Sequence, residues 1–169
     1  MKKLFTMKKL FTMKKLFTIL VSLLVTASVY SQTYEVNKFY PELGGYVIEV
    51  IGGKYGLVVS MKDQGTSTWY NYDALINNPA NYDENGSKFS DWRLPTLREY
   101  NIMCKIFNNG NAPKFNSTYY WTSQENSAAG STTDGRFAVH YNMGNCGSRT
   151  NNKVGVYWVR GIRVFGTLE

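Results

Sequence analysis

The stretch that decides the fold of this chain reads Asp-Trp-Arg-Leu-Pro-Thr-Leu-Arg-Glu, at residues 91–99. Within it, Thr96 and Glu99 have the spacing of a capping box, in which the threonine hydroxyl accepts from the Glu99 amide and the carboxylate accepts from the cap amide. Pro95 disfavours any earlier helical start. Apolar residues then recur at helical spacing as far as Phe107, so the sequence predicts an amphipathic helix that begins after Thr96.

Strand signals lie on both sides of this helix. Residues 46–51 and 55–61 are rich in β-branched and aromatic side chains and flank a Gly-Gly pair, which predicts a hairpin. The other expected elements are a short helix at 69–76, loops at 62–67, 77–90 and 142–153, and strands at 119–123, 136–141 and 154–165, the last interrupted at Gly161. This order predicts an α+β fold with a mostly antiparallel sheet, one or two helices and long irregular loops.

Residues 1–31 predict a secretory signal peptide. Three copies of Met-Lys-Lys-Leu-Phe-Thr, which begin at Met1, Met7 and Met13, precede an apolar stretch too short for a comfortable membrane span. Six residues make no packing unit, so the repeats indicate duplicated coding sequence, with Met13 sufficient as a start. With cleavage before Gln32, we expect an exported protein of the periplasm, cell surface or extracellular space, with no transmembrane segment left.

Cleavage also changes the charge balance. The whole chain has 19 Lys and Arg against 12 Asp and Glu, for a net charge of +7. The signal contains six lysines and no acid, so the remainder has 13 basic and 12 acidic side chains and a net charge of +1. Nucleic-acid binding is therefore not indicated. We expect a lead-in at 32–43 and a single domain at 44–169.

Residues with catalytic or metal-binding chemistry are sparse. His140 is the single histidine, expected to be structural or exposed in its strand, and neither cysteine has a partner at CxxC spacing. No phosphate-binding glycine loop, GxSxG or HExxH motif occurs. We therefore expect neither an enzyme nor a cofactor. Scattered aspartates and loop carbonyls could supply a surface calcium site, but no motif indicates one.

Cys104 and Cys146 leave two arrangements open in a chain bound for an oxidising compartment. A disulfide between them would close a loop of about 40 residues and stabilise the fold by roughly 4 kcal/mol on the chain-entropy model. In the alternative, both thiols are unpaired, one buried on the helix and the other in a loop. Sequence does not show whether the two Cβ atoms meet.

Three short sequence motifs occur in an order that resembles a known protein family. Trp-Arg-Leu-Pro-Thr at 92–96 with Glu99, Tyr-Trp-Thr-Ser-Gln-Glu at 120–125 and Val-Arg-Gly-Ile-Arg at 159–163 resemble the pattern of the Lcl C-terminal domain family. Residues 44–47 and 55–59 resemble the opening hairpin of the same domains, so the resemblance spans about 44–165. It implies a C-type-lectin-like fold, also similar to formylglycine-generating-enzyme-like domains, and a domain of largely unknown function in secreted bacterial proteins.

Most residues of these motifs can be explained by structural roles, as core residues or as members of ion pairs. Trp92, Leu94 and Trp121 are expected in the core, and Arg93 to pair with an acid. We expect Arg160 and Arg163 to point to opposite faces of a strand, one paired with Glu99 or Glu125 and the other facing solvent. The motif residues to which we assign structural roles are Trp92, Arg93, Leu94, Pro95, Thr96, Glu99, Trp121, Ser123, Glu125, Arg160 and Arg163.

The sequence also departs from the functional members of that superfamily. The sugar-binding tripeptides Glu-Pro-Asn and Gln-Pro-Asp are absent, and the paired active-site cysteines of formylglycine-generating enzymes have no counterpart. Calcium-bridged sugar recognition and an enzymatic role are therefore not supported.

The expected function is binding through the late loops of a lectin-like or adhesin module. Amide groups, one cation and two aromatic faces suit a glycan or an extracellular protein. The candidate ligand-binding residues are Asn142, Asn145, Arg149, Asn151, Asn152, Tyr157 and Trp158. Two alternatives stay open: an ordinary solvated loop at these positions, and a structural or assembly component of the bacterial envelope.

Overall fold

The computed structural model describes residues 32–82, 86–107, 110–111, 113–126 and 135–166. The signal peptide expected at 1–31 lies outside them. The chain divides into two compact units, Met1–Gln32 and Thr33–Glu169, and the helices and strands described below belong to the second unit.

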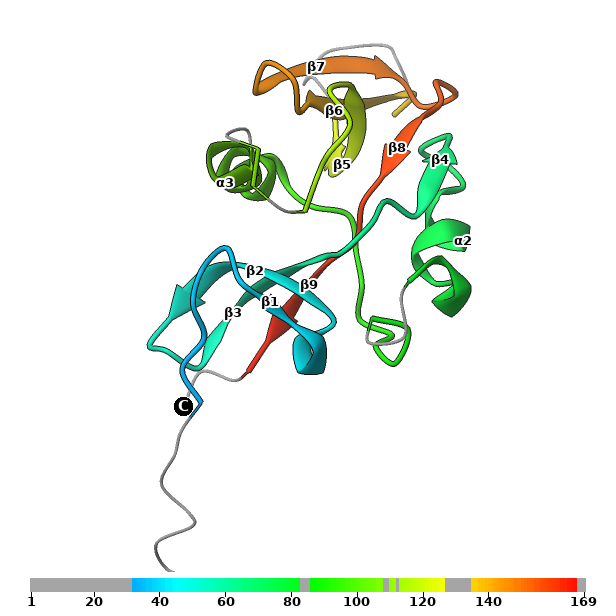
Figure 1. Cartoon of the computed structure of the whole chain (residues 1–169). Helices are drawn as coiled ribbons and strands as arrows, with labels where there is room; N and C mark the ends of the chain where they lie inside the picture. Colours follow the sequence, from blue (N-terminus) through cyan, green and yellow to red (C-terminus); the bar gives the residue numbers. More distant parts are fainter. Residues whose placement is uncertain (1–31, 83–85, 108–109, 112, 127–134, 167–169) are drawn as a thin grey trace, which may run out of the picture. The chain divides into compact units, whose positions relative to one another are not determined.

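The first sheet has four antiparallel strands in the order β1-β2-β3-β9 (Figure 1). Its strands are β1 (Phe39–Tyr40), β2 (Gly45–Ile51), β3 (Tyr55–Ser60) and β9 (Ile162–Phe165). The predicted hairpin is confirmed, because β2 and β3 pair across a turn in which Gly52 and Gly53 have φ of +61° and +78°. The expected lead-in contributes β1 and a 3-10 helix (Pro41–Leu43), because Phe39 and Tyr40 pair with β2.

The second sheet has five strands in the order β4-β8-β5-β6-β7. Its strands are β4 (Gly65–Ser67), β8 (Tyr157–Val159), β5 (Tyr119–Glu125), β6 (Phe137–Asn142) and β7 (Gly147–Asn152). Only the contact between β5 and β8 is parallel. With its helices, the chain is therefore an α+β fold with mostly antiparallel sheets, as predicted.

Two predicted loops contain strands. Residues 142–153 include β7, which pairs with β6 without a break in register, and residues 62–67 include the short β4. The two strands, Gly147–Asn152 and Gly65–Ser67, are built from Gly, Ser, Thr, Asn and Arg, most of which are poor strand formers. Pairing with a neighbouring strand overrides this weak propensity, which local sequence does not reveal. The predicted final strand is a pair, β8 and β9, as the break at Gly161 indicated.

The helix predicted after Thr96 is confirmed as α3 (Leu97–Phe107). The Glu99 amide donates to Thr96 Oγ1 at 3.3 Å, and the Thr96 amide donates to Glu99 Oε2 at 2.8 Å, which completes the capping box. The shorter predicted helix is α2 (Tyr72–Ile76), and a 3-10 helix (Pro79–Asn81) follows it within the expected loop.

Two hydrophobic clusters form the core. One contains Trp92, Leu94 and Trp121, all buried as predicted, with Trp92 stacked on Tyr82 at 4.9 Å between ring centroids. The other surrounds α3 and takes residues from both sheets, Val59 of β3 and Tyr120 of β5 among them, and within it Tyr100 stacks on Tyr141 at 5.3 Å. Aromatic rings therefore supply much of the burial in both clusters.

Cys104 and Cys146 form a disulfide, with their Cα atoms 5.9 Å apart. This settles the alternative that the sequence left open. The bond joins the buried face of α3 to the turn between β6 and β7, where Cys146 has a φ of +55°. It therefore fixes this turn to the helix.

Candidate functional site

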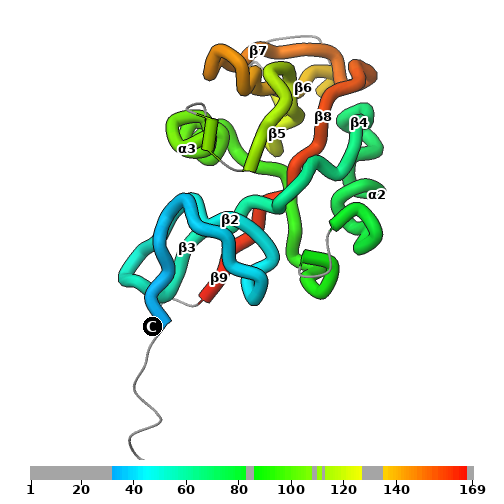
Figure 2. Tube along the Cα trace, in the orientation of Figure 1, coloured from blue at the N-terminus to red at the C-terminus, as the bar shows by residue number. Residues whose placement is uncertain are grey.

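Arg160 lies where the chain passes from one sheet to the other, between β8 and β9. Figure 2 shows this segment beside the one that joins β3 to β4. The Arg160 side chain is fully buried, with Nε 2.8 Å from Asp63 Oδ1. Its terminal nitrogens donate to the carbonyls of Ser60 and Lys114, at 3.0 and 2.8 Å, and its guanidinium lies 4.3 Å from the centre of the Phe115 ring.

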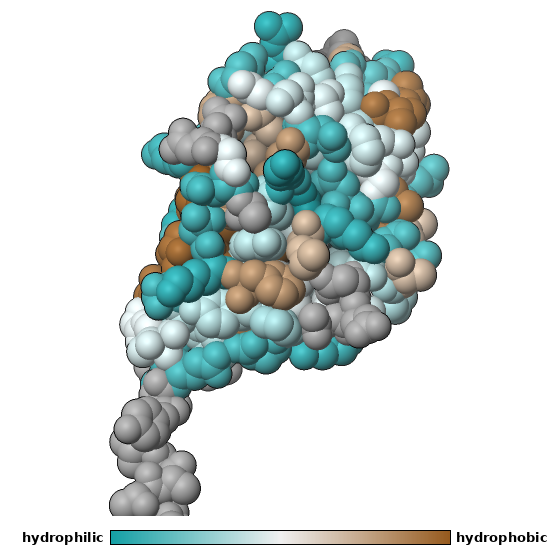
Figure 3. All heavy atoms as spheres, viewed as in Figure 1, coloured by the Kyte–Doolittle hydropathy of each residue, from teal (hydrophilic) through white to brown (hydrophobic). Residues whose placement is uncertain are grey.

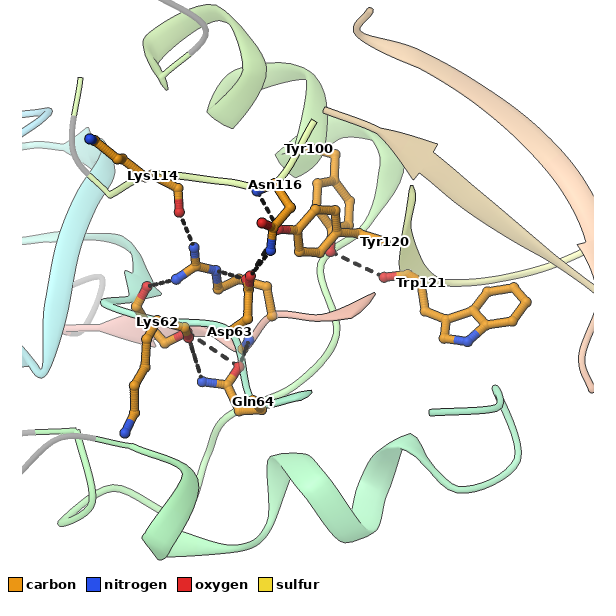
Figure 4. Close-up of polar contacts among 11 residues, drawn as sticks. Lys62, Asp63, Gln64, Tyr100, Lys114, Asn116, Tyr120 and Trp121 are labelled. Carbon is orange, nitrogen blue, oxygen red and sulfur yellow. Dashed lines mark hydrogen bonds and ion pairs between the residues drawn. The ribbon is translucent and has the colours of Figure 1, made fainter. Parts of the chain in front are cut away.

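The second carboxylate oxygen of Asp63 accepts two hydrogen bonds (Figure 4). The Tyr120 hydroxyl and the Asn116 side-chain amide donate to Oδ2, at 3.0 and 2.9 Å. Burial raises the pKa of Asp63, while the charge of Arg160 and these hydrogen bonds oppose that rise. The charged atoms of this cluster all contact other protein groups, so we assign it a structural role.

We predicted that one of Arg160 and Arg163 pairs with Glu99 or Glu125 and that the other faces solvent. Both parts of this prediction are wrong. Neither pairs with a motif glutamate, and neither faces solvent. Arg163 Nε lies 2.7 Å from Asp91 Oδ1, and its guanidinium lies 3.7 Å from the centre of the Phe89 ring. The strand alternation that we assumed does not apply, because the chain leaves β8 at Val159 and enters β9 at Ile162.

The motif glutamates have other partners. Arg93 forms two hydrogen bonds with Glu99, at 2.6 and 2.9 Å, so its predicted pairing with an acid is confirmed. Burial alone would raise the pKa of Glu99, but the hydrogen bonds from Arg93 and Thr96 outweigh it and hold the pKa below its usual value. Glu125 pairs with Lys153 at 3.0 Å.

Ser123 and Pro95 connect two of the sequence motifs, the one at 120–125 and the one at 92–96. The Ser123 amide donates to the Pro95 carbonyl at 2.9 Å, which ties β5 to the segment that precedes α3. The Ser123 side chain is exposed. The motif residues therefore hold the helix, the sheets and their connections together.

The candidate ligand-binding residues divide between the two faces of the five-stranded sheet. Cross-strand pairs place Trp121, His140 and Arg149 on one face, which we call the Arg149 face. Alternation along the strands adds Asn151 and Tyr157 to this face. The opposite face, which packs against α3, we call the helix face.

Trp158 and Asn152 lie on the helix face. Trp158 pairs with Tyr120 across β8 and β5 and packs against the core cluster beside α3. Asn152 Oδ1 accepts from the Val154 amide at 3.1 Å, so this side chain shapes the turn after β7. The structure therefore separates these two candidates from the residues of the Arg149 face.

Asn142 and Asn145 build the turn between β6 and β7. Asn142 Oδ1 accepts from the amides of Gly144 and Asn145, at 2.8 and 3.3 Å. Asn145 Oδ1 accepts from the Gly147 amide at 3.1 Å. Side chains of this type favour turns because they bond to nearby backbone groups. Their carbonyl oxygens are thus already occupied.

Tyr157 spans the Arg149 face. The Asn151 side-chain amide, three strands away in the sheet, hydrogen-bonds the Tyr157 hydroxyl. The Tyr157 ring contacts Trp121 edge-on at 4.7 Å between centroids, and Tyr119 at 5.8 Å. These contacts fix a half-buried aromatic ring beside exposed Asn151 and Arg149 side chains.

His140 lies beneath this surface and is only 3 % exposed. Its ring contacts Tyr119 at 4.4 Å and Tyr157 at 4.7 Å, and Nδ1 has no hydrogen-bond partner among the described residues. Burial lowers the pKa of His140, and the nearby charge of Arg149 lowers it further. The histidine that we expected to be structural or exposed is buried among aromatic rings.

Lys153 closes one side of the Arg149 face. Its ammonium group lies 4.2 Å from the centre of the Trp69 ring and 3.0 Å from Glu125 Oε2, and its side chain is 5 % exposed. The Trp69 amide donates to the Lys153 carbonyl at 2.9 Å. This lysine is therefore a buried structural cation, whereas Arg149 is exposed on this face.

The other features of the described residues give weaker support for a functional site. A cavity of about 170 Å³ lies beside the 3-10 helix after α2, lined by Tyr82, Phe89 and Lys88 among others. Over the described part of the chain, no three His, Cys, Asp or Glu side chains gather where they could hold a metal ion. Of the helices described, none has the length and apolar character needed to cross a membrane. In Figure 3, hydrophobic residues on the visible surface form separate patches rather than one continuous area.

Tyr119, His140 and Trp69 are the residues of this surface that sequence reasoning did not connect with it. Tyr119 and His140 both lie in segments that the sequence predicted as strands, 119–123 and 136–141, and this is the local signal that it offers. Their proximity to Tyr157 depends on the sheet order, which the sequence does not give. The sequence matches no protein-family model, and a search of curated proteins finds no match.

Proposed function

We propose that this chain is an exported, non-catalytic binding domain that recognises a glycan or an extracellular protein on its Arg149 face. Three features of the sequence support export and a binding role: the predicted signal peptide, the resemblance to the Lcl C-terminal domain family and the lack of catalytic motifs. In the same proposal, the two sheets and α3 form a C-type-lectin-like domain of that family.

The observation that carries the proposal is the arrangement of Arg149, Asn151 and Tyr157. Their side chains lie on one sheet face, and Tyr157 is fixed by Asn151 and by the ring of Trp121. A ring that is fixed before binding loses little conformational entropy when a ligand packs on it. Rigid strands also hold a site more accurately than loops do.

The chemistry of this face suits a polar ligand with some apolar surface. A half-buried tyrosine offers a ring on which a sugar or an aromatic side chain can pack. Arg149 adds exposed donors, and it has no ion-pair partner within the described ranges. The disulfide and the turn asparagines hold β7, which carries Arg149 and Asn151.

A binding screen tests the proposal. The described helices and strands lie within Thr33–Glu169, so a chain that begins at Gln32 keeps every contact described above. This chain is applied to immobilised glycans and extracellular-matrix proteins, with and without calcium. The test variant is Asn151→Ala with Tyr157→Ala. Its matched control is Ser148→Ala with Thr150→Ala, which changes exposed residues of the same strand on the helix face.

We expect selective binding by the wild type, weakened at least tenfold in the test variant and unchanged in the control. A tenfold loss corresponds to about 1.4 kcal/mol, the scale of a modest contact. Equal loss in both double variants would instead indicate a general effect on β7. Absence of binding by the folded wild type would contradict the proposal and favour the alternative, a structural or assembly component of the bacterial envelope.

A further inference from the structure

Strand β7 forms one edge of the five-stranded sheet. It is six residues long and largely exposed, and among the described residues it pairs only with β6. The other end of this sheet, β4, is three residues long, and β1 in the first sheet has two residues. Proteins commonly protect sheet edges by keeping them short. By that comparison, β7 is the long open edge.

The hydrogen-bond pattern identifies the backbone groups that face outward. The Lys153 amide donates to the Arg136 carbonyl at 2.8 Å, so this pair belongs to the bonded set, and every second pair along the ladder is bonded too. The Val139 carbonyl faces β5, where it accepts from Thr122 Oγ1. Its cross-strand partner Thr150 therefore points its own N–H and C=O away from β6.

The same alternation turns Ser148 and Asn152 outward, but Asn152 is satisfied locally. Its amide donates to Asn151 Oδ1 at 2.7 Å, and its carbonyl accepts from the Gly155 amide at 2.9 Å. Ser148 and Thr150 together keep two donors and two acceptors on the outer edge, without a partner among the described residues. This is the pattern that one added strand requires.

We propose that the outer edge of β7 binds an extended strand of a partner protein that carries an acidic residue opposite Arg149. Ser148 and Thr150 bond to the backbone of the added strand, and Arg149, which lies between them, faces its cross-strand neighbour on the Arg149 face. Opposite charges in such directly opposed positions stabilise a strand pair.

Arg149 also excludes the simplest other partner, a second copy of this chain. A two-fold pairing that used the free groups of both Ser148 and Thr150 would place the two Arg149 side chains opposite each other. Like charges in opposed positions destabilise the pair. The strand has no proline, lysine or bulge that would block pairing altogether. The edge therefore selects a strand of opposite charge.

Two matched peptides test this inference. Both are capped and alternate threonine with valine, one around a central glutamate and one around a central lysine. Each is titrated into the chain that begins at Gln32, with binding followed through the amide signals of β7 by NMR. We expect the glutamate peptide to bind at least fivefold more tightly, and we expect Arg149→Glu to reverse this preference.

Thr150 provides the control for the mode of binding. Thr150→Pro removes one outward N–H and is compatible with an edge position whose N–H faces solvent, so we expect the fold to persist and peptide binding to be lost. Thr150→Ser keeps this N–H and should bind as the wild type does. Thr150 lies on the helix face, so Thr150→Pro separates this edge from ligand binding on the Arg149 face.

Three results would overturn the inference. They are the absence of binding by either peptide at millimolar concentration, equal affinity of the wild type for both peptides, and unchanged binding by folded Thr150→Pro. If Thr150→Pro does not fold, reversal of the charge preference by Arg149→Glu decides the question.

Discussion

Arg160 and Asp63 form an ion pair in the interior, with Nε and Oδ1 2.8 Å apart. The two residues lie on the connections that carry the chain between its sheets, from β3 to β4 and from β8 to β9. Tyr120 and Lys114, which lie around the start of β5, contact the same two side chains. The ion pair therefore links the two connections between the sheets.

Removal of Arg160 should strongly destabilise the fold. Arg160→Ala leaves Asp63 buried without its cation, and breaking a buried pair in this way typically costs about 3–5 kcal/mol. Urea unfolding followed by tryptophan fluorescence measures the loss. Lys38→Ala, at an exposed ion pair with Glu35, is the control and should change stability little. Equal stability of the two variants would show that the Arg160 pair does not hold the fold.

The disulfide should contribute substantially to stability. Cys104 and Cys146 are 42 residues apart, and closing a loop of this size stabilises by about 4 kcal/mol on the chain-entropy model. We expect the double variant Cys104→Ser with Cys146→Ser to lose stability of this order, and the wild type with reductant to behave like it. Thermal unfolding of both samples checks this. A reduced wild type that melted at its oxidised temperature would refute the role assigned to the bond.

Glu99 should make stability depend on pH in the acid range. Its pKa is held below the ordinary value of 4.5, so its charged form stabilises the folded state above that pH. The contribution is lost as the pH falls from about 4.5 through the lower folded pKa. Glu99→Gln should therefore be less stable than the wild type at pH 7, and the difference should shrink below pH 4. A difference independent of pH would exclude the charge as its source.

His140 should give a second, separate pH dependence. Its pKa in the folded state is below the ordinary value of 6.5, so the unfolded chain takes up the proton first as the pH falls. The sign is a loss of stability as the pH falls through the interval below 6.5, and no change above it. His140→Phe keeps an aromatic ring in the cluster and should flatten the curve of unfolding free energy between pH 7 and 5. A variant with an unchanged curve would show that another group titrates there.

The elements that sequence predicted well are those whose signal is local. Thr96 and Glu99 define the start of α3 by their own side chains, and the Gly52-Gly53 turn defines the hairpin of β2 and β3. In both cases the residues that decide the structure are close together in the chain. Such signals need no knowledge of the rest of the fold.

The elements that sequence missed depend on contacts between distant residues. β7 reads Gly-Ser-Arg-Thr-Asn-Asn, which is polar throughout, and it is a strand because β6 pairs with it. Arg160 finds Asp63, 97 positions earlier in the chain, rather than the motif glutamates. The candidate site divided for the same reason, because the sheet order puts Tyr157 beside Asn151 and turns Trp158 to the helix face. The residue types of the site could be predicted from the sequence, but which of them come together in space could not.

The most direct test of a binding surface on the Arg149 face is a map of ligand contacts by NMR, with the ligand that the screen selects. The account predicts that side-chain signals of Arg149, Asn151 and Tyr157 shift on titration, together with those of Tyr119, while signals of α3 and of Trp158 stay in place. Shifts that centre on α3 or on Trp158, with the Arg149 face unaffected, would contradict it.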